Sequence, residues 1–149
     1  MKSLLVAAAL AAAFPACAAT FRVDDATSMP RENQTQMRWR SLAPNRSIGH
    51  DVEGNAVVTV RLNLAPWLNK QGRIFLALPE QSVGQVNAEW TTQGRLINGQ
   101  VASGNRTLVY SGPIRSALLE ETLVMRIWTD GRRLVAPQRL DFQFEIDVE

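Results

Sequence analysis

Few side chains in this sequence could act as a nucleophile, a base or a zinc ligand, because the chain has one histidine and one cysteine. A serine or cysteine nucleophile needs a base held beside it, and His50 is the one histidine that could serve. A zinc site needs several histidine or cysteine ligands at fixed spacing. The sequence also lacks the Gly-x-Ser-x-Gly motif and the glycine-rich loops that bind phosphate. We therefore predict that the protein is not an enzyme and holds no metal or cofactor.

Paired carboxylates are another arrangement that performs hydrolysis, as in glycosidases. Two adjacent pairs occur in the sequence, Asp24-Asp25 and Glu120-Glu121. Neighbouring side chains of a strand point to opposite faces, so the members of such a pair do not converge on one bond of a substrate. We therefore assign no catalytic role to either pair.

The C-terminal run offers a different kind of site, because apolar residues alternate with polar ones. Its apolar members are Leu140, Phe142, Phe144, Ile146 and Val148. This period of two predicts a strand with one buried face. An exposed strand of this kind can pair with a neighbouring chain, and acidic residues on its other face would limit uncontrolled pairing. The alternative is an ordinary final strand that closes the domain.

Four acidic side chains lie on the other face of this run. They are Asp141, Glu145, Asp147 and Glu149. Opposite charges on adjacent strands attract each other across a sheet. We interpret these residues as a solvated acidic face, and we expect their partners to be Arg38, Arg40 or Arg126.

Four tryptophans could form a binding surface. Trp39 and Trp90 lie on the apolar faces of alternating runs, so we expect both in the core. Trp67 follows a proline in a loop, and Trp128 shares a strand face with Arg126. Exposed aromatic side chains often mark binding sites. Trp67 and Trp128 are therefore the candidate residues for binding a glycan or a protein.

The elements that must position these residues are strands. Short runs with a period of two are separated by Gly, Pro, Asn and Asp. The alternating runs are 37–40, 58–64, 86–90, 123–128 and 140–149. The run 73–78 is apolar on both faces, and residues 106–110 are predicted to form another strand. Asn98-Gly99 is typical of a tight hairpin turn, and residues 114–121 resemble a helical turn.

This pattern predicts an all-β fold, an antiparallel, immunoglobulin-like β-sandwich of about seven to nine strands. A small barrel is the alternative. The polar residues 20–35 are interpreted as an N-terminal leader, and residues 36–149 as one sandwich domain.

The first nineteen residues have the organisation of a signal peptide: a basic residue, an apolar run from Leu4 to Phe14, and a small-residue cleavage site. The apolar run is shorter than the roughly 20 residues that span a bilayer, so we predict no transmembrane segment. Cleavage is expected after Ala18 or Ala19. A lipoprotein signal carries Leu three residues before its cysteine, where this chain has Phe14, so we expect no lipid anchor at Cys17.

Cleavage would remove Lys2 and Cys17, leaving 15 basic and 14 acidic residues and no cysteine. This balance does not favour nucleic acid as a partner, because nucleic-acid binders carry a clustered basic excess. An exported domain without disulfides must be stabilised by its core.

These features together favour an exported, non-enzymatic structural or interaction protein. Our first hypothesis is a fimbrial (pilus) subunit or pilus-associated protein of a bacterial chaperone–usher system, joined to other subunits or a chaperone by strand addition. The alternative is a secreted or periplasmic module that binds glycan or protein. The protein is expected in the periplasm, in a fimbrium at the cell surface, or outside the cell.

Overall fold

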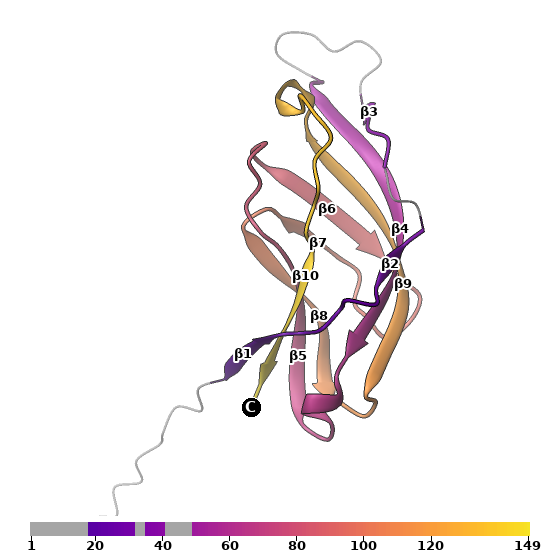
Figure 1. The fold of residues 1–149 in the computed structure, drawn as a ribbon, viewed down its shortest axis with the longest axis vertical. Helices are drawn as coiled ribbons and strands as arrows, with labels where there is room; N and C mark the ends of the chain where they lie inside the picture. The colour runs from indigo at the N-terminus through magenta and orange to yellow at the C-terminus, as the bar shows by residue number, and fades with distance from the viewer. Residues whose placement is uncertain (1–17, 32–34, 41–48) are drawn as a thin grey trace, which may run out of the picture.

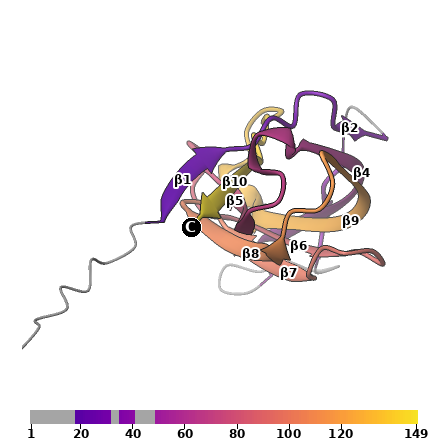
Figure 2. The same cartoon turned by 90° about the horizontal axis from the view of Figure 1, so that it is seen from below.

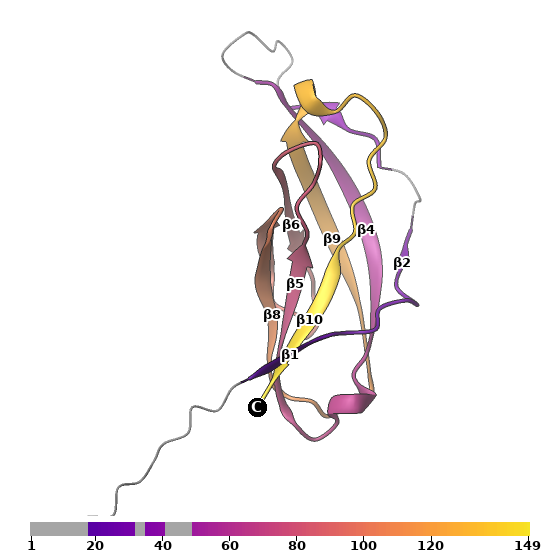
Figure 3. The ribbon, with the colours of Figure 1, turned by 60° about the vertical axis from the view of Figure 1, so that its left-hand side comes forward.

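The computed structural model describes residues 18–31, 35–40 and 49–149, which form two antiparallel sheets packed face to face. Figure 3 shows the two layers, with β5 and β10 in one and β4 and β9 in the other. The predicted antiparallel sandwich is confirmed. Residues 1–17, which make up most of the predicted signal peptide and include Cys17, lie outside the described residues.

The first sheet has four strands and two edges. In spatial order they are β1 (Ala19–Arg22), β10 (Gln143–Val148), β5 (Gln71–Leu78) and β8 (Asn105–Pro113). Both termini of the fold lie in this sheet, and Figure 1 shows β1 leading into it beside the C-terminus. The run 73–78, apolar on both faces, is the interior strand that its composition suggests.

The second sheet is built on two thirteen-residue strands that pair along their whole length. Its strands in spatial order are β2 (Met29–Pro30), β4 (Asp51–Asn63), β9 (Leu118–Asp130), β6 (Val86–Thr91) and β7 (Gly99–Ala102), and β3 (Arg38–Trp39) also pairs with β4. The described residues thus form ten strands. The number of strands exceeds the predicted seven to nine because two-residue strands such as β2 and β3 are too short to give an alternating sequence pattern.

The final strand does not lie beside the one before it. β10 lies between β1 and β5, whereas β9 belongs to the second sheet. In immunoglobulin domains the last two strands are neighbours in one sheet. The chain therefore shares the sandwich architecture with those domains but has a different strand order.

The segment interpreted as a polar leader contributes a strand to each sheet. β1 joins the first sheet, β2 joins the second, and Val23 between them is 1% exposed. The amide of Val23 donates to the Phe144 carbonyl at 2.8 Å, and the Asn63 amide donates to the Asp24 carbonyl at 3.0 Å. Val23 therefore fixes the chain where it crosses from one sheet to the other.

The core lies between the sheets and is made of inward-facing side chains from both. Trp90 is its largest buried side chain, and its indole Nε1 donates to the Ile97 carbonyl at 2.9 Å. Trp90 is therefore in the core, as predicted. The prediction that Trp39 also lies in the core is wrong, because Trp39 is 51% exposed. The cause is the position of β3, a two-residue strand that pairs with β4 at the edge of the sheet.

Two local predictions are also wrong. Asn98-Gly99 does not form a tight turn; the Asn98 side chain instead accepts a hydrogen bond from the Thr92 amide at 2.8 Å and closes a longer loop between β6 and β7. The turn between β7 and β8 uses Gly104, whose φ of 84° suits glycine. Residues 114–121 are not helical, since β9 already begins at Leu118.

Candidate functional site

The N-terminal strand β1 forms the edge of the first sheet against the C-terminal strand β10. Figure 2 shows β1 on the outside of this sheet, next to β10. All four residues of β1 are exposed. The register pairs are Ala19 with Val148, Thr20 with Asp147, Phe21 with Ile146, and Arg22 with Glu145.

On the inner side of β1, Phe21 makes an aromatic contact. Its ring centroid lies 6.0 Å from that of Trp67, and Phe21 remains 47% exposed. A single tilted ring contact of this kind stabilises by about 0.5–1.5 kcal/mol. The inner side of β1 is therefore weakly packed in comparison with the buried strands.

On the outer side of β1, Thr20 donates from its Oγ1 to Asp147 Oδ1 at 2.6 Å. Asp147 is 7% exposed although it points away from the core. Arg106 covers it, donating to its two carboxylate oxygens at 3.1 and 3.2 Å, and the Arg73 guanidinium lies 4.0 Å away. The hydrogen bonds from Arg106 lower the pKa of Asp147 against the opposing effect of burial.

Arg106 connects this carboxylate to the rest of the outer face. It donates to Glu145 at 3.2 Å and lies 4.1 Å above the ring of Phe75, a cation–π contact. Thr20, Asp147, Phe75 and Arg106 come from β1, β10, β5 and β8, so the cluster joins all four strands of the sheet. We name these residues, with Arg73 and Glu145, the Asp147 cluster.

The partners of the acidic face therefore differ from those expected. Glu145 and Asp147 pair with Arg106, and Asp147 also with Arg73, not with Arg38, Arg40 or Arg126. The reason is the strand order: β10 lies in the first sheet beside β5, whereas the three expected arginines lie on or beside the second sheet.

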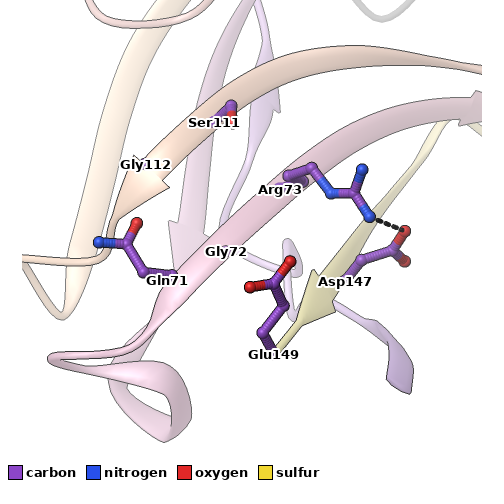
Figure 4. A pocket seen from close by; sticks show the side chains of 7 residues that line it. All are labelled: Gln71, Gly72, Arg73, Ser111, Gly112, Asp147 and Glu149. Atoms are coloured by element: carbon purple, nitrogen blue, oxygen red, sulfur yellow. Dashed lines mark ion pairs between the residues drawn. The ribbon is translucent and has the colours of Figure 1, made fainter. Parts of the chain in front are cut away.

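A shallow polar hollow of about 310 Å³ borders the Asp147 cluster on the side of β5 and β8. In Figure 4, Arg73 and Asp147 point toward each other over this hollow. Gly72 and Gly112 are register partners, and a Cβ at Gly72 would point inward against the buried side chains of Ile114 and Ile146. The lining residues are Gln71, Gly72, Arg73, Ser111, Gly112, Asp147 and Glu149.

The apolar residues of the C-terminal run divide into two groups. Phe144, Ile146 and Val148 lie in β10 and are buried in the core. Leu140 and Phe142 precede β10 and are partly buried against the core. The backbone of β10 is paired on both sides, with β5 and with β1. An added strand would therefore reach β10 by taking the place of β1.

The two candidate tryptophans are not brought together. Trp128 pairs with Glu53 near the start of β4, whereas Trp67 lies in the short 3-10 helix η1 (Ala65–Trp67) beyond the end of that strand. At about 3.3 Å per residue, the intervening strand separates them by roughly 30 Å. They do not form one binding surface.

Trp128 is half-buried on the outer face of the second sheet, between two arginines. The guanidinium of Arg126 lies 5.4 Å and that of Arg40 5.9 Å from the ring centroid. Arg126 also pairs with Glu89 at 2.8 Å, and Arg40 with Glu53 at 3.3 Å. The ring thus lies within a network of charges that neutralise one another.

The residues considered for catalysis are dispersed. Glu120 points outward and accepts from Arg61 at 2.7 Å, whereas Glu121 accepts from the Leu96 amide at 2.9 Å. Among the described residues, no group of three or more His, Cys, Asp or Glu side chains is arranged to hold a metal ion. The same part of the chain has no helix with the length and hydrophobicity needed to cross a bilayer.

Comparison with known proteins gives no assignment: no family model, no curated protein and no solved structure matches this chain.

Sequence reasoning missed Thr20, Arg73 and Arg106. Thr20 lies in a stretch that shows no periodicity, so nothing in the sequence places it opposite Asp147. Arg73 and Arg106 lie in predicted strands, but the sequence does not say which strands are neighbours. The one usable signal was the outward acidic pair Glu145 and Asp147, which requires cations on adjacent strands.

Proposed function

We propose that this protein is an exported, non-enzymatic structural and interaction protein that assembles by strand addition. A fimbrial subunit or pilus-associated protein of a bacterial chaperone–usher system is the specific form of this proposal. The observation that carries it is β1: a short, exposed strand near the N-terminus that occupies the edge position on β10.

A strand in this position can be exchanged between copies. Backbone hydrogen bonds provide most of the attachment of an added strand, and they are the same whether the strand comes from its own chain or another. Val23, the residue that follows β1, is buried and anchors the chain there, so β1 can leave β10 while the sandwich stays closed. If β1 of each copy fills the edge of the next copy, the contact is head-to-tail and continues into a chain of subunits.

Cysteine cross-linking tests this proposal, because the sequence contains no cysteine after Cys17. Arg22 and Glu145 are register partners on the outer face of the β1–β10 ladder. Opposed residues of an antiparallel pair lie about 4.5–5.5 Å apart between Cα atoms, within reach of a disulfide. Mature Arg22→Cys and Glu145→Cys proteins are mixed and oxidised.

We expect a covalent heterodimer on non-reducing gels if β1 of one copy occupies β10 of the other. The matched control replaces Glu145→Cys by Gln143→Cys, which lies on the same face of β10 but out of register with Arg22. Equal cross-linking by both cysteines, or by neither, would contradict strand exchange at this edge.

A binding module for glycan or protein is the second candidate, and the outer face of the second sheet favours it. Trp128 with its two arginines offers an aromatic face and hydrogen-bond donors. Trp39 is exposed near the same end of β4, but its register partner Val52 is buried, so Trp39 lies on the opposite face of the sheet from Trp128. A glycan array with a Trp128→Ala protein tests this candidate, with Trp39→Ala and Trp67→Ala as comparisons because neither ring lies beside Trp128. Binding retained by all three variants would exclude these tryptophans.

A further inference from the structure

We infer that Asp147 determines which strand β10 accepts and in which register, by requiring a hydroxyl side chain directly opposite it. For strands from other copies this inference rests on the proposed function; for the chain's own β1 it does not. The partner it describes is an extended segment with a Ser or Thr facing Asp147, as Thr20 does in β1.

The first argument is the state of the carboxylate. Asp147 is nearly buried, and Arg106 and Thr20 both donate to its Oδ1. A buried carboxylate that loses a donor pays a desolvation cost, so a strand without a hydroxyl at this position binds less well. A charged acceptor also forms a stronger hydrogen bond than a neutral one, and the 2.6 Å distance is short.

The second argument is register. A slip of one residue would turn Phe21 to the outer face and Thr20 to the inner one, because side chains alternate along a strand. A slip of two residues that keeps the faces would place Arg22 opposite Asp147, where Arg106 and Arg73 already lie. A third guanidinium there would be repelled by the other two. Thr20 is thus the residue of β1 that can lie opposite Asp147 and keep the hydrogen bond without adding a further positive charge.

The third argument is that the carboxylate of Asp147 is already in position before β1 arrives. Arg106 holds Asp147 from the side of β8 and is itself fixed by Phe75 and Glu145. These contacts come from β5, β8 and β10 and do not involve β1. The acceptor oxygen therefore keeps its position when β1 leaves, and it is ready to select the next strand.

The test uses two substitutions at one position in the full mature protein. Thr20→Val removes the hydroxyl and keeps the side-chain shape, whereas Thr20→Ser keeps the hydroxyl. Thr27→Val, in an exposed turn beyond Val23, is the control for a general effect of the substitution. Amide hydrogen exchange of Phe21, whose register pair with Ile146 follows the hydrogen-bonded pair of Val23 with Phe144, reports how often β1 leaves β10. The cross-linking yield described above reports exchange between copies.

We expect Thr20→Val to raise the equilibrium constant for opening of β1 by about ten-fold, because the substitution removes one hydrogen bond to a charged group. The opening measured in the Thr20→Ser and Thr27→Val proteins should match that of the parent protein. Equal exchange in the Val and Ser variants would overturn the role of Asp147. If the hydroxyl controls β1 opening but no variant cross-links between copies, the inference holds for the chain's own β1 and the proposed assembly is wrong.

Discussion

At the scale of the residue, Asp147 is a nearly buried carboxylate that accepts hydrogen bonds from two other strands of its sheet. Its pKa is lowered because Arg106 and Thr20 donate to the ionised form. A group with a lowered pKa in the folded state stabilises the fold above its unfolded pKa of about 3.9. That stabilisation is lost as the pH falls through the folded pKa. The first sheet should therefore weaken in acid, below about pH 4.

Asp147→Asn should lower the free energy of unfolding at pH 7 by about 1–3 kcal/mol, because Arg106 loses its ionised partner and Thr20 a charged acceptor. Urea denaturation at pH 7 and pH 3 measures the effect. The difference between the parent protein and the variant should shrink at pH 3, because protonation of Asp147 below its unfolded pKa of about 3.9 favours the unfolded state. Glu149→Gln, an exposed acid on the same face, is the control. A difference that is equal at both pH values would mean that the charge of Asp147 contributes nothing.

At the scale of the element, β1 is expected to open without the rest of the sandwich. It has four exposed residues, and Val23 behind it is buried. Phe21→Ala removes the ring contact with Trp67, and the expected loss is about 0.5–1.5 kcal/mol. This loss should appear as faster exchange of the amide at position 21, which faces β10, while the urea midpoint of the whole protein changes little. Arg22→Ala is the control on the outer face. A large fall in the midpoint would show that β1 does not open independently.

The elements also show what the sequence can predict. Alternation located the long strands and placed Trp90 in the core, because a period of two depends on which face is buried. It did not predict β1, whose Ala-Thr-Phe-Arg sequence is too short to show a period. Trp39 was misplaced because alternation identifies a face but not whether another layer covers it. The partners of Asp147 could not be predicted because they depend on the spatial order of strands, which connects residues more than forty positions apart.

At the scale of the whole molecule, stability and assembly should compete for the same strand. β1 closes the sheet of its own chain, and the proposed assembly requires β1 to leave it. A disulfide between Arg22→Cys and Glu145→Cys in one chain would hold β1 in place, and the positions are register partners. The bond would close a loop of roughly 120 residues, for which a stabilisation of about 2–4 kcal/mol is typical.

The oxidised double variant should therefore unfold at higher urea concentration than its reduced form and should remain monomeric in size-exclusion chromatography. Reduction should restore both the lower stability and the ability to assemble. The parent protein treated with the same reductant is the control, since its sequence has no cysteine after Cys17. If the oxidised monomer still assembles, the subunits join through another edge, such as β8 in the first sheet or β7 in the second, both of which lie at the ends of their sheets.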